Sequence, residues 1–266
     1  MTTATVRAAL PAARRHRMSL WRLEWLRLTR TPRAIALAVL FAVIGLVEPV
    51  ATRYASDLIS HLSHGARVSL PPPTPAQAIN SYVTEITLIG LILVVALTAG
   101  ALSFDTSHGL ATFLRTKASS MWELVVPRVA VHAGAAAAAY VLGSLCAWYE
   151  TRVLIGSVPA AAMLEGMLCG VAYFVLAVTL TALAASLVRS TIGTVAITLG
   201  ILIALPIAGT FGVIASWLPS ALVNAPVGLA GGTQRFSHYL PALAVSVAAD
   251  ALALAVAVRR LRAREI

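Results

Sequence analysis

The chain has 266 residues, of which 59% are hydrophobic and 11% are charged, and its net charge is +10. A soluble domain carries about 25% charged residues, so this chain could not cover a water-facing surface and is expected to use a bilayer as its solvent. Its basic residues flank apolar stretches, which fits the positive-inside bias of membrane proteins better than binding to nucleic acid. The two cysteines, Cys146 and Cys169, lie inside apolar stretches and suggest neither a disulfide framework nor a metal cluster.

Residues 1–33 form a basic segment that ends in an amphipathic pattern. At 100° per residue over residues 19–32, Trp21, Trp25 and Leu28 share one helical face, while Arg22 and Thr29 share another. Tryptophan on one side and arginine on the other predict a helix that lies in the membrane interface. The alternative is a positive flank that only orients the first span.

Residues 34–266 are predicted to form an all-α transmembrane domain. Six stretches reach the roughly 20 residues that a helix needs to cross a bilayer. They cover residues 34–52, 82–104, 124–149, 160–188, 191–217 and 239–258. Gly90, Gly100 and the alanine run 135–139 are expected to let neighbouring helices approach closely. Pro206 and Gly209 predict a kink or a break in the fifth span.

Two connections on the predicted outer side are longer than a simple turn. Residues 53–81 contain prolines at 71–73 and 75, and are predicted to be stiff and extended rather than helical. Residues 218–238 are half apolar but broken by Pro and Gly, which predicts short re-entrant helices that do not cross. His61 and His64 lack a nearby third ligand, so no metal is predicted there.

The basic residues predict the orientation of the spans. Cytoplasmic termini put 16 basic residues inside and leave Arg53, Arg67, Arg152 and Arg235 outside. This split favours an even number of spans, with both termini on the cytoplasmic side of the plasma membrane.

No nucleotide-binding or catalytic motif occurs in the sequence. A G-x-x-x-x-G-K-[ST] phosphate loop is absent, as are G-x-S-x-G, H-E-x-x-H and C-x-x-C, so the chain is not expected to be an enzyme or to hold a cofactor. Asp250 lies near the middle of the sixth span, where a charge costs about 2.5–3.5 kcal/mol on the insertion scale. It belongs either to a substrate or proton path or to a hydrogen-bonded helix contact. Glu48 and Glu85 could together line an outer mouth.

The amphipathic segment Phe104–Arg128 separates two uncharged runs, residues 88–102 and 129–148. It can neither cross the bilayer nor form a domain of its own, so it is expected to lie at the membrane face. It resembles the loop after the second span of ABC-2-type permeases, the membrane subunits of ATP-binding-cassette exporters. The matching residues are Asp105, Gly109, Leu110, Phe113, Leu114, Ser119, Ser120, Trp122, Glu123 and Arg128. Lys117-Ala118 replaces the family's usual proline.

The resemblance implies that two permease chains pair, as a homodimer or a heterodimer, and that each presents this segment as a cytoplasmic coupling helix. Two copies of a P-loop ATPase subunit would bind ATP and Mg²⁺, and spans one, two and five would bound the path of a hydrophobic or amphipathic drug, lipid or peptide. Apolar anchors for the partner would be Phe113, Leu114 and Trp122. Charges that could pair with the partner are Asp105, Arg115 and Lys117.

Other interpretations of the same residues remain open. The segment could lie on the lipid, with Trp122 as its interfacial anchor. The protein could instead be a proton-coupled transporter or a membrane enzyme that uses Asp250, or an anchor that transports nothing.

Overall fold

The computed structural model describes residues 20–62, 71–102, 121–210, 212 and 214–263. Every regular element in these ranges is helical, and six helical stretches are long and apolar enough to cross a membrane. They are Pro32–Arg53, Pro75–Leu102, Met121–Leu154, Ala160–Leu187, Thr191–Gly209 and Phe236–Ala263. The chain is therefore an all-α integral membrane protein, as the sequence predicts.

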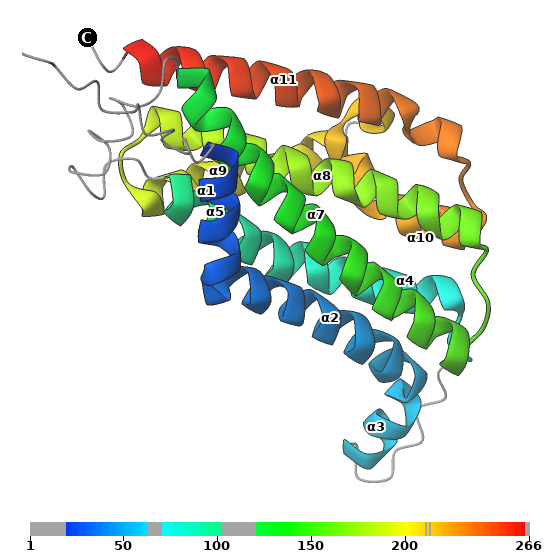
Figure 1. Cartoon of the computed structure of the whole chain (residues 1–266). Helices are drawn as coiled ribbons and strands as arrows, with labels where there is room; N and C mark the ends of the chain where they lie inside the picture. The colour runs from blue at the N-terminus through cyan, green and yellow to red at the C-terminus, as the bar shows by residue number, and fades with distance from the viewer. Residues whose placement is uncertain (1–19, 63–70, 103–120, 211, 213, 264–266) are drawn as a thin grey trace, which may run out of the picture.

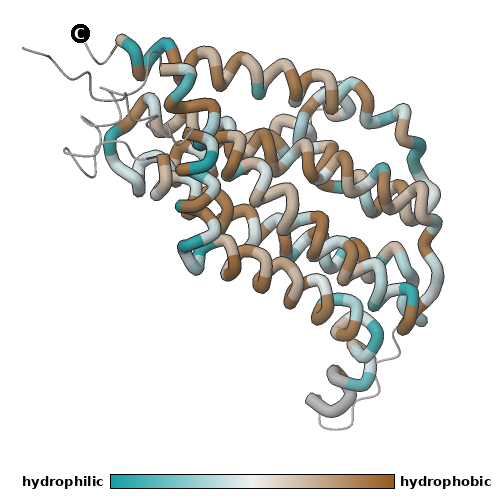
Figure 2. The backbone as a smooth tube through the Cα atoms, viewed as in Figure 1, coloured by the Kyte–Doolittle hydropathy of each residue, from teal (hydrophilic) through white to brown (hydrophobic). Residues whose placement is uncertain are grey.

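Apolar residues run along the lengths of the helices, and polar residues gather toward the two ends of the bundle (Figures 1 and 2). One end carries α1, the starts of α2 and α7 and the ends of α5 and α11 (Figure 1). We call it the α1 end. The described arginines at the α1 end are Arg22, Arg27, Arg30, Arg33, Arg128, Arg189, Arg259, Arg260 and Arg262. Arg53, Arg152 and Arg235 lie toward the opposite end, so the bundle itself is asymmetric in charge.

The first two helices meet at a sharp turn. Helix α1 (Leu20–Arg30) stops one residue before α2 (Pro32–Arg53). Thr31 between them is extended, with φ −98° and ψ 144°, because a residue that precedes proline is pushed out of the helical region. Pro32 then starts α2 at a position where its missing N–H costs nothing. As a result α1 points away from the axis of α2 (Figure 1).

The prediction of an extended connection over residues 53–81 is wrong for much of its length. Helix α3 (Ala55–Leu62) follows α2 almost directly, and α4 (Pro75–Glu85) begins before the predicted start of the second span. The Thr74 side chain accepts a hydrogen bond from the Gln77 backbone N–H at 3.3 Å, and Pro75 takes the first helical position. Thr74 and Pro75 therefore start a helix by capping it, rather than stiffening an extended chain.

The second span contains one π-helical turn between two α-helical parts. Helix α4 continues as a π-helical turn (η1, Ile86–Gly90) and then as α5 (Leu91–Leu102). Gly90 permits the close approach that was predicted, since a Cβ there would lie 2.9 Å from the Phe41 ring of α2. The same prediction for Gly100 is wrong within the described residues, because a Cβ at that position would meet none of their atoms within 4 Å.

The third span is longer than a bilayer requires. Helix α7 (Met121–Leu154) has 34 residues. At 1.5 Å per residue it is about 51 Å long, compared with about 30 Å for the hydrocarbon core. Its first turns include Trp122, Glu123 and Arg128, which the sequence pattern placed in the polar segment. The end of that segment is therefore continuous with a membrane-spanning helix.

The remaining spans are joined by one tight turn and one series of short helices. Helices α8 (Ala160–Leu187) and α9 (Thr191–Gly209) follow each other closely. The predicted continuation of the fifth span to residue 217 is wrong, because α9 ends at Gly209, soon after Pro206 removes a backbone donor. The elements that follow are η3 (Ala215–Trp217), η4 (Pro219–Asn224), α10 (Ala225–Ala230), η5 (Phe236–Tyr239) and α11 (Leu240–Ala263). The predicted short helices are thus present, while their depth in the bilayer stays a prediction.

Helix α8 is the centre of the bundle and contacts α5, α7, α9, α10 and α11. The face of α7 that carries Ala136 and Ala139 is buried, as the alanine run predicted. Helices α2 and α7 also approach each other closely, because a Cβ on Gly45 would lie 2.2 Å from the carbonyl oxygen of Gly143. Small residues thus bring helices together in lipid, where close van der Waals contact drives their association.

Candidate functional site

The predicted coupling residues fall into two groups. Those in the middle of the segment lie outside the described residues: Asp105, Gly109, Leu110, Phe113, Leu114, Arg115 and Lys117. Trp122 and Glu123 lie on the first turn of α7, where both side chains are exposed. Because α5 ends and α7 begins at the α1 end, both attachment points of the segment lie there (Figure 1).

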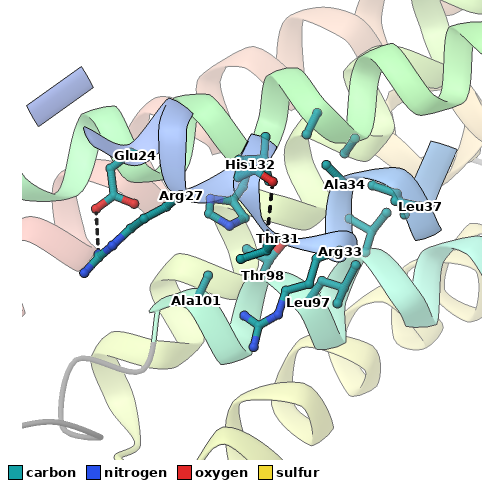
Figure 3. Close-up of a pocket in the computed structure, with 14 residues that line it drawn as sticks. Glu24, Arg27, Thr31, Arg33, Ala34, Leu37, Leu97, Thr98, Ala101 and His132 are labelled. Carbon is teal, nitrogen blue, oxygen red and sulfur yellow. Dashed lines mark hydrogen bonds and ion pairs between the residues drawn. The ribbon is translucent and has the colours of Figure 1, made fainter. Parts of the chain in front are cut away.

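An ion pair joins α1 to the first part of α7. The Glu24 carboxylate oxygen Oε1 accepts hydrogen bonds from Arg128 Nε at 3.1 Å and from Arg128 Nη2 at 2.9 Å. Both side chains are buried, with exposures of 7% for Glu24 and 6% for Arg128. Arg27, one turn along α1, donates to the same oxygen from Nη1 at 3.3 Å (Figure 3). The carboxylate thus gathers two guanidinium groups from two helices.

This arrangement fixes α1 against a membrane-spanning helix. A buried charge that loses its partner is costly, so separating α1 from α7 would leave Glu24 and Arg128 without their buried contact. The turn at Thr31 is also braced, since the Thr31 hydroxyl donates to the Leu28 carbonyl at 3.1 Å. A displacement of the start of α7 would therefore be transmitted to α1 and, across a single residue, to α2.

Sequence reasoning missed Glu24. A signal was present, because Glu24 is the sole acidic residue among residues 1–47 and interrupts a basic, Leu-rich pattern. The residues predicted to share the interfacial face of α1 separate in the structure. Trp21 and Trp25 are exposed, while Leu28 lines a cavity next to Glu24. The face of α1 that packs on the bundle is therefore the one that carries Glu24.

Asp250 has a partner on the neighbouring helix. Its Oδ1 atom accepts a hydrogen bond from the Thr179 hydroxyl, which links α11 to α8 inside the bundle. Asp250 is half-buried, whereas Thr179 is buried, with its hydroxyl 2.9 Å from the Leu176 carbonyl as well. This contact is the hydrogen bond between helices that was considered as the structural role of Asp250. A substrate or proton role for it stays a prediction.

Glu48 of α2 and Glu85 of α4 lie on turns that face each other, toward the end of the bundle opposite α1. Glu48 lies one turn before Thr52 on α2, and Glu85 lies one turn after Ser81 on α4. The Thr52 hydroxyl donates to the Ser81 hydroxyl at 3.1 Å, so these parts of the two helices face each other. Both glutamates are half-buried, and their role at an outer mouth stays a prediction.

The side chains of the two histidines considered for a metal lie outside the described part of the structure. His61 lies in α3, and His64 lies outside the described residues. Among the described residues, no group of three His, Cys, Asp or Glu side chains is placed to hold a metal ion.

Comparison with known proteins agrees with the membrane assignment. No protein-family model matches the chain, and no solved structure matches it. Over 140 residues the chain is 21% identical to the uncharacterized transmembrane protein YxlG of Bacillus subtilis (strain 168). The chain is a multi-pass membrane protein. The alignment covers 52% of this chain and 54% of YxlG, so the chain spans about half the length of that relative.

Proposed function

We propose that the chain is the membrane permease subunit of an ATP-driven exporter of the ABC-2 type. ATP hydrolysis takes place on a separate P-loop ATPase subunit that docks on the segment between α5 and α7. A second permease chain, identical or not, completes the transporter, and the substrate is a hydrophobic or amphipathic drug, lipid or peptide. In this proposal the α1 end faces the cytoplasm, as the positive-inside rule predicts.

The observation that supports this proposal best is the Glu24–Arg128 ion pair. A soluble motor moves membrane helices only through a stiff connection, because a flexible link would absorb the motion. Here the docking segment leads straight into α7, which is one helix from Met121 onward. The ion pair would carry the same motion to α1 and then to α2, so one docking event would act on two spans.

The test is co-purification of the tagged chain with the product of the adjoining gene, followed by an ATPase assay. A stoichiometric P-loop partner is expected, and Phe113→Ala/Leu114→Ala should remove most of its binding, because truncated apolar anchors commonly cost about 2 kcal/mol or more each, roughly thirtyfold in affinity. Leu164→Ala/Leu168→Ala is the matched control, since both of these leucines are exposed on the part of α8 that lies away from the α1 end. It should leave binding unchanged.

Two outcomes would reject the proposal. In the first, the chain purifies alone and its transport or stability does not respond to nucleotide. In the second, a P-loop partner binds the Phe113→Ala/Leu114→Ala variant as well as it binds the parent chain, which would place docking elsewhere. A chain whose transport needs a proton gradient and is abolished by Asp250→Asn would be a proton-coupled transporter instead.

A further inference from the structure

A cavity of about 280 Å³ lies at the α1 end, between α1, the start of α2, the end of α5 and α7. Arg27, Arg33, Thr98 and His132 supply polar groups to its lining (Figure 3). Glu24 of the ion pair borders the cavity, together with Arg27 of α1 and His132 of α7, while Arg33 and Thr98 come from α2 and α5, which the ion pair does not join directly.

The charge that the described residues place around the cavity is positive. The Glu24 carboxylate is already bound by Arg128 and Arg27. Arg33 reaches the cavity as well, and no other described residue forms an ion pair or a hydrogen bond with it. Two guanidinium groups, those of Arg27 and Arg33, thus line the cavity with the one carboxylate of Glu24, which favours an anion as the ligand.

Thr98 contributes an uncharged polar group to the cavity. Its side chain lines the cavity and the residue is only 2% exposed, yet its hydroxyl forms no hydrogen bond to any described residue. Other threonines in the described spans, such as Thr181 and Thr198, bond their hydroxyls to the carbonyl one turn back. The hydroxyl oxygen of Thr98 is not one of the fully buried polar atoms that lack a partner, so it is accessible from the cavity and can bond a polar group placed there.

His132 adds a second polar group of defined orientation. Its Nδ1 atom lies 2.9 Å from the Arg128 carbonyl oxygen, and because a carbonyl can only accept, Nδ1 carries the hydrogen. The other ring nitrogen, Nε2, is therefore the atom that remains to interact with a ligand, and in the neutral ring it accepts a hydrogen bond. The cavity can thus offer positive charge, a hydroxyl and an imidazole nitrogen to one ligand.

The polarity of the lining changes with depth. On each of three helices, the lining residue one turn further into the bundle is apolar: Leu37 follows Arg33 on α2, Val94 lies below Thr98 on α5, and Ala136 follows His132 on α7. The deeper part of the lining is therefore apolar, while the polar groups lie toward the α1 end, where Leu28 and Ala101 also line the cavity. A phospholipid in the adjoining leaflet has the same order, with its phosphate at the surface and its acyl chains inside.

We propose that this cavity binds the phosphate headgroup of an anionic phospholipid from the leaflet at the α1 end. Arg27 and Arg33 bind the phosphate, Thr98 and His132 bind other polar atoms of the headgroup, and the deeper apolar wall contacts the start of an acyl chain. The bound lipid bridges α1, α2, α5 and α7. This proposal does not depend on the exporter assignment, since it concerns a lipid site on the chain alone.

The test is native mass spectrometry of the purified full-length chain in detergent micelles that contain equal amounts of dioleoylphosphatidylglycerol and dioleoylphosphatidylcholine. One phosphatidylglycerol per chain is expected to be retained in preference to phosphatidylcholine. Arg33→Gln should weaken that retention about tenfold, as the loss of one charge-assisted hydrogen bond would. Arg30→Gln is the matched control, because it removes the same charge from the same end of the bundle at a position that does not line the cavity.

The Thr98→Val variant distinguishes binding of a lipid in the cavity from general attraction of the lipid to the positive charge of the α1 end. It keeps the shape of the side chain and removes the hydroxyl, so it should lower phosphatidylglycerol retention while leaving the melting temperature of the lipid-free protein unchanged or raised. Equal retention of the two lipids, or equal effects of Arg33→Gln and Arg30→Gln, would overturn the proposal. Displacement of phosphatidylglycerol by an equal concentration of inorganic phosphate would also overturn it, by showing a site for free phosphate.

Discussion

The middle of the molecule and its α1 end are held together by different forces. In the middle, helices meet at glycines: a Cβ on Gly45 would lie 2.2 Å from the Gly143 carbonyl oxygen, and one on Gly170 would lie 2.1 Å from the Tyr140 hydroxyl oxygen. At the α1 end, the contact between α1 and α7 depends on the Glu24 carboxylate, and a cavity lies beside it.

This difference suggests which part of the molecule can respond to a signal. Close packing tolerates little displacement, because dispersion contacts weaken steeply over a gap of about 1 Å or less. Side chains around the ion pair can move into the adjacent cavity, and the strength of the ion pair depends on other charges nearby. We therefore expect the packed middle to move as a unit and the α1 end to be the place where a partner or a lipid acts.

The largest effect is expected from removing one member of the Glu24–Arg128 ion pair. Glu24→Ala removes the buried carboxylate that bonds both Arg128 and Arg27, and loss of one member of a buried pair typically costs about 3–5 kcal/mol. The expected result is a clear fall in the unfolding midpoint of the purified chain. Intrinsic tryptophan fluorescence can follow it, since Trp21 and Trp25 lie on the same helix as Glu24.

The double variant Glu24→Leu/Arg128→Met is the control for that prediction. It removes both charges of the pair, and apolar replacement of a buried pair is often neutral or stabilising. Most of the stability lost in Glu24→Ala should return. If the double variant is as unstable as the single one, the two side chains are not a mutually dependent pair.

The next largest effect is expected at the packed middle. Gly45→Ala forces a methyl group against the backbone of α7, and overpacking of this kind costs about 1–3 kcal/mol. Thermal unfolding in detergent should show a lower midpoint. Gly134→Ala is the matched control on α7, because a Cβ there would meet nothing within 4 Å and alanine favours the helix by up to about 1 kcal/mol. Equal destabilisation by the two variants would contradict the packing argument.

The smallest effect is expected at Asp250. Asp250→Asn keeps an oxygen that can accept the Thr179 hydrogen bond, so the contact between α8 and α11 should survive with a change in stability of less than about 1 kcal/mol. Under the proposed function, ATP-driven transport should be perturbed but retained. Substrate accumulation in cells or vesicles measures this, and complete loss of transport with unchanged folding would assign Asp250 a functional role.

The sequence was sufficient to predict the spans because length and hydropathy are local properties. Apolar stretches of sufficient length located all six helices that can cross a membrane in the described part of the chain. Helix ends were less well predicted. Thr74 and Pro75 act as a cap and a first helical residue, a signal that was visible in the sequence but was interpreted as extended chain.

Tertiary structure alone decided which side chains meet. Glu24 and Arg128 are separated by 104 residues, and no local pattern links them. The same holds for Gly45 with Gly143 and for the surroundings of Thr98, because close contacts between helices depend on how the helices rotate and cross. The sequence by itself determined that this chain is a bundle of membrane-spanning helices with a basic end. Only the packing of those helices determined the buried ion pair and the cavity beside it, since both are formed by residues from different helices.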